Sequence, residues 1–244
     1  MKEVRKIKPM ILVLTFVMLL TGCVSGSVQA VGEVYQVVRK TYVDRAISIS
    51  YPELSGMSDA EKQQRLNQLI RSEALAMLAD YEASELEKLT VKLDYVVVRQ
   101  DAKLFSVRFN GSRFLKGTAY PTRFVQGVNL DLQAGRKLRL PEIVQLDEQF
   151  VEAIKNGRMN AVEGVTWEKL RLDNKKLLQA FHQADFVVST ENPSRAFSYF
   201  TQGGIGISIG VIHALGDHVE FELSMDVLKS FVKPDNAHVI KLTE

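Results

Sequence analysis

The sequence is poor in the residue types that build cross-links and metal sites. Its 244 residues include one cysteine, Cys23, and four histidines. A single thiol cannot form a disulfide within the chain, and a structural zinc site needs four ligands, usually cysteine and histidine. The folded part must therefore be held together by an apolar core, for which 46% of hydrophobic residues is an ordinary share.

Long apolar runs are also missing. The longest, residues 10–20, is interrupted only by Thr15, and a membrane-spanning helix needs about 20 apolar residues. A basic start, an apolar region of about 7–15 residues and a short cleavage sequence are typical of a secretory signal peptide. We therefore predict a signal peptide at residues 1–22, whose basic start consists of Lys2, Arg5, Lys6 and Lys8.

The end of this segment gives the cysteine a role. Leu20-Thr21-Gly22-Cys23 resembles the lipobox of bacterial lipoproteins, in which a peptidase cuts just before a lipidated cysteine. The resemblance implies lipidation of Cys23 and an extracytoplasmic location, anchored in the cell membrane by acyl chains. Each buried methylene of such a chain contributes about 0.8 kcal/mol. The alternative is an ordinary signal peptide with a coincidental cysteine.

Positive charge is concentrated in the same leader. Without residues 1–22, the 31 basic and 29 acidic residues of the chain become 27 and 28, so the net charge is −1. No polybasic tract remains in the predicted mature chain, which argues against nucleic acid as a partner.

The rest of the sequence predicts a tether and a folded region. Residues 23–34 are mostly small or polar and are typical of a flexible linker. The remaining length fits one domain or two small ones, since about 100–200 residues per domain is usual. We predict an N-terminal domain at residues 35–140 and a C-terminal domain at residues 141–244. Whether these halves form two domains or one continuous sheet stays open.

Two strands and an amphipathic helix are predicted first. Residues 35–51 contain two strand-like runs, which Pro52 and Gly56 are expected to end. Ser58 and Glu61 match a capping box at the start of a helix. Apolar residues then recur every three or four positions, at Leu66, Leu69, Ile70, Ala74, Met77, Leu78 and Tyr81. The opposite helix face, expected to be solvated, carries Arg65, Arg71, Glu73 and Asp80.

Strands with a period of two follow this helix. Apolar residues alternate with polar ones within residues 93–97, 105–109 and 128–132. Asn110-Gly111 predicts a tight turn, because both central residues of a type I′ turn have positive φ. Ala134-Gly135 predicts another turn. Sequential strands joined by turns favour an antiparallel sheet, with the helix packed across its apolar face.

The second half repeats this mixture of helices and strands. Asp147 and Asp173 are expected to cap two helices, and Met159 is expected on the inner face of the first. Strands are predicted at residues 185–190, 195–201, 205–212 and 218–223. Ser224 is expected to cap a closing helix. The whole pattern predicts an α+β fold of antiparallel sheets with helices packed on one face, in two sequential halves.

Several of these segments are similar to a known family. They resemble the paired domains of unknown function in the extracytoplasmic part of the anti-sigma factor RsiV and beside the catalytic domain of the peptidoglycan deacetylase PdaC. The similar segments are residues 49–56, 128–140, 185–188, 204–209 and 219–228. By analogy only, the resemblance implies a lysozyme or peptidoglycan-related ligand.

One loop departs from the family pattern. The family often has a histidine in the loop before residues 128–132, and this chain has Tyr120 at that position, within Gly117-Thr118-Ala119-Tyr120-Pro121. Tyr120 is therefore a candidate ligand-binding residue. The alternative is that its ring only packs against the sheet.

Patterns typical of enzymes are missing. No Gly-x-Ser-x-Gly nucleophile elbow is present, and Gly203-Gly204-Ile205-Gly206 lacks the spacing of a dinucleotide site. Glu220 and Glu222 share one face of a strand and are expected to be solvated. We predict no catalytic residue, no cofactor and no metal site.

Two functions remain. The favoured hypothesis is a non-catalytic lipoprotein that binds a protein or a cell-envelope ligand outside the membrane. The alternative is a hydrolase acting on envelope polymers, with acid–base roles for some of His182, Asp185, His213 and His218. The alternative requires these side chains to converge in one pocket.

Overall fold

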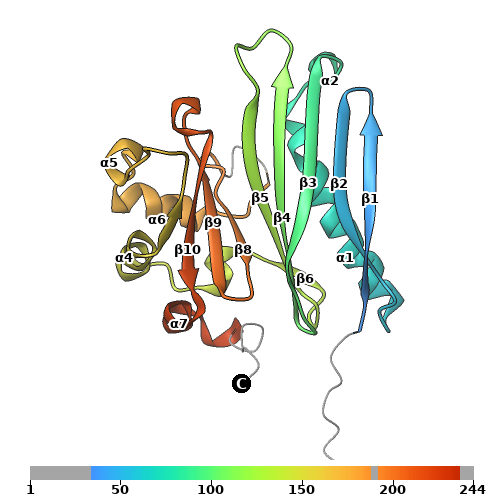
Figure 1. Ribbon diagram of the computed structural model, residues 1–244. Helices are drawn as coiled ribbons and strands as arrows, with labels where there is room; N and C mark the ends of the chain where they lie inside the picture. Colours follow the sequence, from blue (N-terminus) through green and yellow to red (C-terminus); the bar gives the residue numbers. More distant parts are fainter. Residues whose placement is uncertain (1–33, 188–191, 237–244) are drawn as a thin grey trace, which may run out of the picture. The chain divides into compact units, whose positions relative to one another are not determined.

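Ten strands form two sheets in residues 34–187 and 192–236, the part of the chain that the computed structural model describes. The first sheet holds β1 to β6 in chain order, and the second has the order β7-β10-β9-β8 (Figure 1). Of the eight pairings between these described strands, seven are antiparallel, as predicted, and β2–β3 is parallel. The predicted α+β class is confirmed.

Ten strands and seven α-helices lie in the part of the chain that the structure describes. The first sheet consists of β1 (Gln36–Asp44), β2 (Ile47–Ser55), β3 (Leu89–Gln100), β4 (Leu104–Leu115), β5 (Thr122–Asp131) and β6 (Arg136–Leu138). The second consists of β7 (Arg158–Asn160), β8 (Phe197–Phe200), β9 (Gly204–Gly210) and β10 (His218–Ser224). The helices are α1 (Ala60–Leu75), α2 (Ala83–Leu86), α3 (Leu140–Ile143), α4 (Glu148–Asn156), α5 (Trp167–Leu170), α6 (Asn174–His182) and α7 (Met225–Leu228).

The predicted leader, Cys23 and most of the tether lie outside the described residues. All described residues belong to one compact unit, although they form two sheets and two hydrophobic clusters. The division into domains at residue 140 stays a prediction. Among the residues described, no helix is both long enough and apolar enough to cross a membrane.

Helix α1 covers one face of the first sheet. Its buried side chains Leu66, Ile70 and Ala74 belong to the same cluster as Phe105 and Phe109 of β4. The alternation within β4 sends those rings to the helix side, as the sequence pattern predicted. The N-cap is Asp59, one residue after the predicted Ser58, and the carboxylate of Asp59 accepts from the backbone of Lys62 in the first turn.

Glu73 of α1 is not solvated as expected. Only 6% of its surface is exposed, and its carboxylate pairs with Lys137 of β6 at 2.6 Å. A buried carboxylate needs such a partner because desolvation disfavours the charge. The partner comes from a strand 64 positions away, so no helical pattern could show it.

The predicted turn at Asn110-Gly111 is wrong. Both residues lie inside β4 and pair across the sheet, Gly111 with Leu93 on one side and with Phe124 on the other. A Cβ atom at Gly111 would lie 2.5 Å from the Phe124 ring. Glycine is therefore required here for close packing and not for a turn.

Strand β2 also continues past Pro52, where it was expected to stop. Pro52 pairs with Arg39 of β1, and β2 pairs with β3 only from Ile47 to Ile49. Proline is tolerated in a strand where a ladder partner is missing on one side. The β2–β3 pairing is parallel because α1 connects the two strands.

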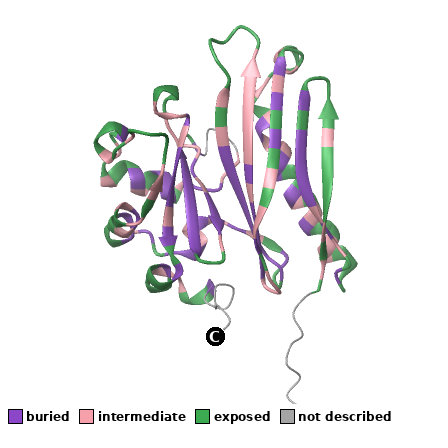
Figure 2. Cartoon of the chain, viewed as in Figure 1, coloured by how far each residue is buried: buried purple, intermediate pink, exposed green. Residues whose placement is uncertain are grey.

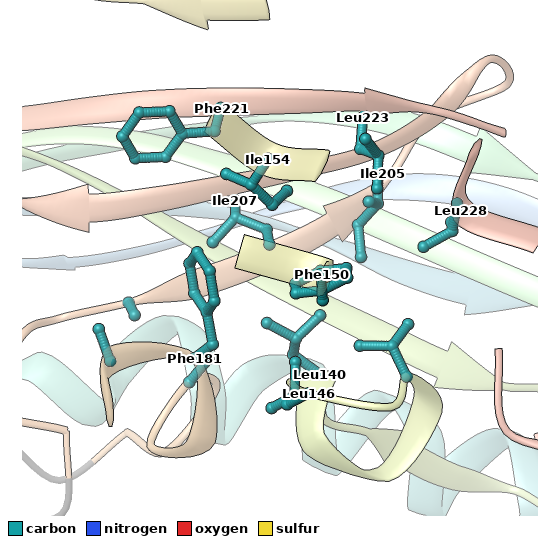
Figure 3. Packing of buried hydrophobic residues seen from close by; sticks show 14 of the residues in the cluster. Leu140, Leu146, Phe150, Ile154, Phe181, Ile205, Ile207, Phe221, Leu223 and Leu228 are labelled. Atoms are coloured by element: carbon teal, nitrogen blue, oxygen red, sulfur yellow. The ribbon is translucent and has the colours of Figure 1, made fainter. Parts of the chain in front are cut away.

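The second sheet is covered by short helices over a core of aromatic and aliphatic side chains (Figure 3). Asp147 and Asp173 cap α4 and α6 as predicted. The Phe150 and Phe181 rings meet edge to face with centroids 5.6 Å apart. Strand β9 is buried along almost its whole length, whereas β1 at the edge of the first sheet is mostly exposed (Figure 2).

Two local predictions in this half are wrong. Met159 lies in β7 and not in a helix, because α4 ends at Asn156, with Gly157 as its C-cap. Asp185 lies in a turn with a φ of 68° and not at the start of a strand. Aspartate is among the few non-glycine residues that adopt this conformation without large strain.

The two sheets touch where β8 crosses β5. The amide of Asn129 donates to the backbone oxygen of Ser198 at 3.1 Å. Gly127 permits this approach, since a Cβ atom there would lie 1.9 Å from that same oxygen. The side of the first sheet away from α1 therefore faces the second sheet through a partly polar contact.

We expect Gly127→Ala to lower the free energy of unfolding by about 2–3 kcal/mol, because the added methyl group would overpack the contact between the sheets. Gly203→Ala is the matched control, since a Cβ atom at Gly203 meets nothing within 4 Å. Urea unfolding of both variants measures the difference. Equal stability of the two would show that the close approach at Gly127 does not matter.

Candidate functional site

A cavity of about 1110 Å³ lies beside β5, between the two sheets and the segment around α5. Its walls come from both sheets and from the loops before α6 and β8. The residues on which its chemistry depends are Asp80, Arg113, Arg123, Val125, Arg171, Arg195, Ser208, Asp217 and His218. Asp80 and His218, which are 138 positions apart in the sequence, thus line the same cavity.

The cavity runs along the edge of β5. Five consecutive residues, 122–126, line it, although alternate side chains of a strand point to opposite faces. Strand β6 pairs with β5 only from Asn129 to Asp131, and no other described strand pairs with the preceding part of β5 on that side. The cavity therefore faces a strand edge and not only a sheet face.

Cationic side chains outnumber anionic ones around the cavity. Asp80 is the nearest carboxylate to two of them, with its Oδ2 atom 3.9 Å from Arg113 and 3.6 Å from Arg195. No carboxylate among the described residues lies within ion-pair distance of the guanidinium groups of Arg123 or Arg171. The site has positive charge available for a ligand.

The backbone is strained at the same place. Five non-glycine residues have positive φ in the described part of the chain, and three of them line the cavity: Arg171 at 52°, Arg195 at 46° and Asp217 at 73°. For the two arginines this conformation costs about 1–3 kcal/mol each, and such strained residues are concentrated at functional sites. Aspartate adopts it more easily. Their clustering supports a functional role for this cavity.

Two polar atoms in the cavity wall lack partners. Ser208 is 1% exposed and its Oγ has no hydrogen bond in the described structure, and the same holds for Nδ1 of His218. Burial lowers the pKa of His218, although the neighbouring Glu220 carboxylate opposes this effect. A ligand could satisfy both atoms, because buried polar groups normally have partners.

Glu220 joins the sheets and is not solvated as expected. Its carboxylate accepts from Nε and Nη2 of Arg108 on β4, at 2.7 and 2.5 Å, and from the Tyr199 hydroxyl at 2.6 Å. Burial opposes ionisation, but these hydrogen bonds outweigh it and lower the pKa of Glu220. The carboxylate is charged at neutral pH and is occupied by structural partners. Glu222 is partly exposed and accepts from Asn160.

Asp185 is the centre of a second buried network. Its carboxylate accepts from Ser198 N and Ser198 Oγ, at 2.6 and 2.7 Å, and from the backbone of Leu140 at 2.7 Å. Lys137 donates to the backbone oxygen of Asp185. Burial raises the pKa of Asp185 to about 6, and the charge of Lys137 and the hydrogen bonds only partly offset this.

The predicted candidate Tyr120 lies close to the cavity wall. Its ring stacks on His213 with centroids 3.7 Å apart, and Nδ1 of His213 is 2.9 Å from Asp217. The other oxygen of Asp217 accepts from the backbone of Arg123. Tyr120 remains 48% exposed, so one side of this stack is accessible. Its role in ligand binding stays a prediction.

The four residues of the hydrolase hypothesis do not share this cavity. His218 lines it, whereas His213 contacts it only through Asp217, and Asp185 is enclosed in its own network. His182 is exposed at the end of α6. Within the described residues, no three His, Cys, Asp or Glu side chains are grouped closely enough to hold a metal ion.

Sequence reasoning missed Arg123, Arg171, Arg195 and Ser208. Each looks like an ordinary surface or strand residue in its own segment, and only the tertiary fold brings these residues together. No sequence pattern within a single segment indicates that these arginines gather around one cavity.

No protein-family model and no curated protein matches the sequence. Solved structures have a similar fold. A DUF3298 family protein from Bacteroides fragilis has a TM-score of 0.50 and 15% identity, with 86% of this chain and 98% of that chain covered. For a DUF3298 family protein from Pseudomonas aeruginosa the TM-score is 0.49 and the identity 15%, with 83% and 94% covered. The likeness concerns the fold alone, that of a domain of unknown function.

We expect the stability difference between the wild type and Asp185→Asn to depend on pH. The pKa of Asp185 is raised to about 6, above its ordinary value of 3.8. Its titration therefore favours the folded state most below pH 4, and this contribution is lost as the pH rises through 6. The loss amounts to about 3 kcal/mol.

Urea unfolding between pH 4 and pH 7 tests this, because Asp185→Asn removes the titration. The wild type should lose about 2 kcal/mol relative to the variant across that interval, since part of the full loss occurs below pH 4. A difference that is constant with pH would show that Asp185 has no raised pKa.

Proposed function

We propose that the protein is an extracytoplasmic lipoprotein, anchored in the cell membrane through Cys23, whose α+β domain binds a protein or a cell-envelope ligand without transforming it. The lipobox-like Leu20-Thr21-Gly22-Cys23 supports the anchor. Lysozyme and peptidoglycan-related molecules are the ligands that the sequence resemblance implies by analogy.

The observation that carries the binding role is the cavity beside β5. It combines a volume of about 1110 Å³ with surplus positive charge, strained backbone and the unpartnered Ser208 Oγ. Concave sites with a few convergent polar groups are the usual form of ligand-binding sites. None of these features stabilises the fold, so their presence at one place supports a binding role.

The geometry favours binding over hydrolysis. The oxygens of Asp185 and Glu220 are engaged by Ser198, Leu140, Arg108 and Tyr199. A general acid or base must reach the substrate within hydrogen-bond distance, directly or through one water. Asp185 and Glu220 do not line the cavity, and their carboxylates are engaged by structural partners, which supports a role of both in the fold.

Co-sedimentation with purified peptidoglycan sacculi and retention on immobilised lysozyme test the binding role, with the full-length chain in detergent. We expect retention by at least one of them and no release of soluble fragments from the sacculi. Failure with both would count against the proposal, and release of fragments would favour the hydrolase.

The anchor leads to a separate prediction. We expect the chain purified from bacterial membranes to begin at residue 23 and to carry acyl chains, whereas Cys23→Ala should abolish this modification because it removes the thiol that carries the lipid. Intact-mass spectrometry measures both, and Val24→Ala is the control that should remain lipidated. An unmodified cysteine in the wild-type product would contradict the anchor.

A further inference from the structure

Beside the cavity, the edge of β5 that precedes Asn129 has no strand partner among the described residues. The Arg123 N–H leaves the β4 ladder and donates to Asp217 Oδ2 at 2.9 Å. Because strand backbone groups alternate with a period of two, the N–H and C=O of Val125 point the same way. Asn129 and Asp131, further along the same series, pair with β6 on that side.

Val125 is 4% exposed, yet no strand lies beside it on the cavity side in the described structure. Buried backbone donors and acceptors are nearly always paired. An unpaired strand edge is a template for another extended segment, which binds through its own main chain. The edge therefore suits a peptide better than it suits a ligand without a backbone.

Charge indicates what kind of peptide fits. Arg123 is on the free edge itself, and Arg171 and Arg195 line other walls of the same cavity. Carboxylates are the natural partners of such guanidinium groups, because bidentate hydrogen bonds add to the charge attraction. Three acidic side chains in the lining, Asp80, Glu168 and Asp217, do not balance the five cationic ones, which are Arg113, Arg123, Lys169, Arg171 and Arg195.

Size points the same way. The volume of about 1110 Å³ is above the roughly 300–1,000 Å³ usual for small-molecule sites. Apolar residues, among them Phe124, Phe186 and Ile212, line the remaining wall and can receive the alternate side chains of an extended segment.

We propose that the cavity binds an extended, carboxylate-bearing peptide that adds to the free edge of β5 at Val125 and places its acidic side chains on Arg123, Arg171 and Arg195. This inference rests on the proposed ligand-binding function and specifies its ligand class. The backbone of Val125 supplies the register, the arginines supply the charge selectivity, and Asp217 limits how far the added strand extends by occupying the Arg123 N–H.

The probe is a fluorescein-labelled peptide of alternating glutamate and valine, Glu-Val-Glu-Val-Glu-Val, measured by fluorescence polarisation with the full-length chain in detergent. We expect saturable binding that weakens at least tenfold when lysine replaces glutamate. N-methylation of alternate peptide bonds should also weaken it about tenfold, because it blocks the edge hydrogen bonds while the charge is kept. Equal binding of either altered peptide would overturn the proposal.

The double variant Arg123→Glu/Arg171→Glu tests the site. Both arginines are exposed, so the fold should persist, which thermal unfolding checks. We expect it to weaken peptide binding at least tenfold. Lys40→Glu/Arg45→Glu, at β1 and the turn after it, is the matched control, with binding unchanged within twofold.

Retention by sacculi or lysozyme is followed in parallel to separate the two proposals. If a folded wild type is retained there but does not bind the acidic peptide, the peptide proposal fails and the general binding function stands. If inorganic phosphate displaces the peptide as well as free glutamate-containing peptide does, the site recognises charge alone, and the edge-pairing proposal is overturned.

Discussion

The ion pair between Arg108 and Glu220 is the contact on which the arrangement of the two sheets depends. Arg108 projects from β4 and Glu220 from β10, and two hydrogen bonds join them, with Tyr199 as a third partner. Removal of one member of such a buried pair costs about 3–5 kcal/mol, because the other charge is left without compensation. Asn129 and Ser198 add a second polar contact, so this interface has a fixed register rather than a sliding apolar surface.

The cavity lies beside this interface and is lined by residues of both sheets. Strand β6 covers β5 only as far as Asn129, and β8 crosses β5 at Gly127, so no strand that the structure describes pairs with β5 at Val125 on that side. The networks of Asp185 and Glu220 use their carboxylates to hold the walls in place. In the described part of the chain, Ser208 Oγ and His218 Nδ1 have no hydrogen-bond partner, and the Arg123 guanidinium group has no carboxylate within ion-pair distance. This difference separates structural polar residues from candidate recognition residues.

The sequence predicted the features that depend on neighbouring residues. Asp147 and Asp173 cap their helices and Leu66 and Ile70 are buried on α1, since caps and periodicity are local. Glu220 was misread as solvated because its partner lies 112 positions away. Gly111 was misread as a turn because the Phe124 ring that requires it comes from the next strand. The cavity had no local signal, since positive φ at Arg171 or Arg195 follows from tertiary constraints.

Unfolding with two probes tests most directly whether the sheets form one unit around the cavity. The only tryptophan, Trp167, stacks on Phe221 in the second core, so its fluorescence reports that half of the molecule. Pulsed hydrogen exchange of the Val107 amide in β4 reports the other half in the same urea series. If the polar interface couples the sheets as described, the two transitions will have the same midpoint and slope. Separate midpoints would show two independent domains and would contradict a binding site built by their junction.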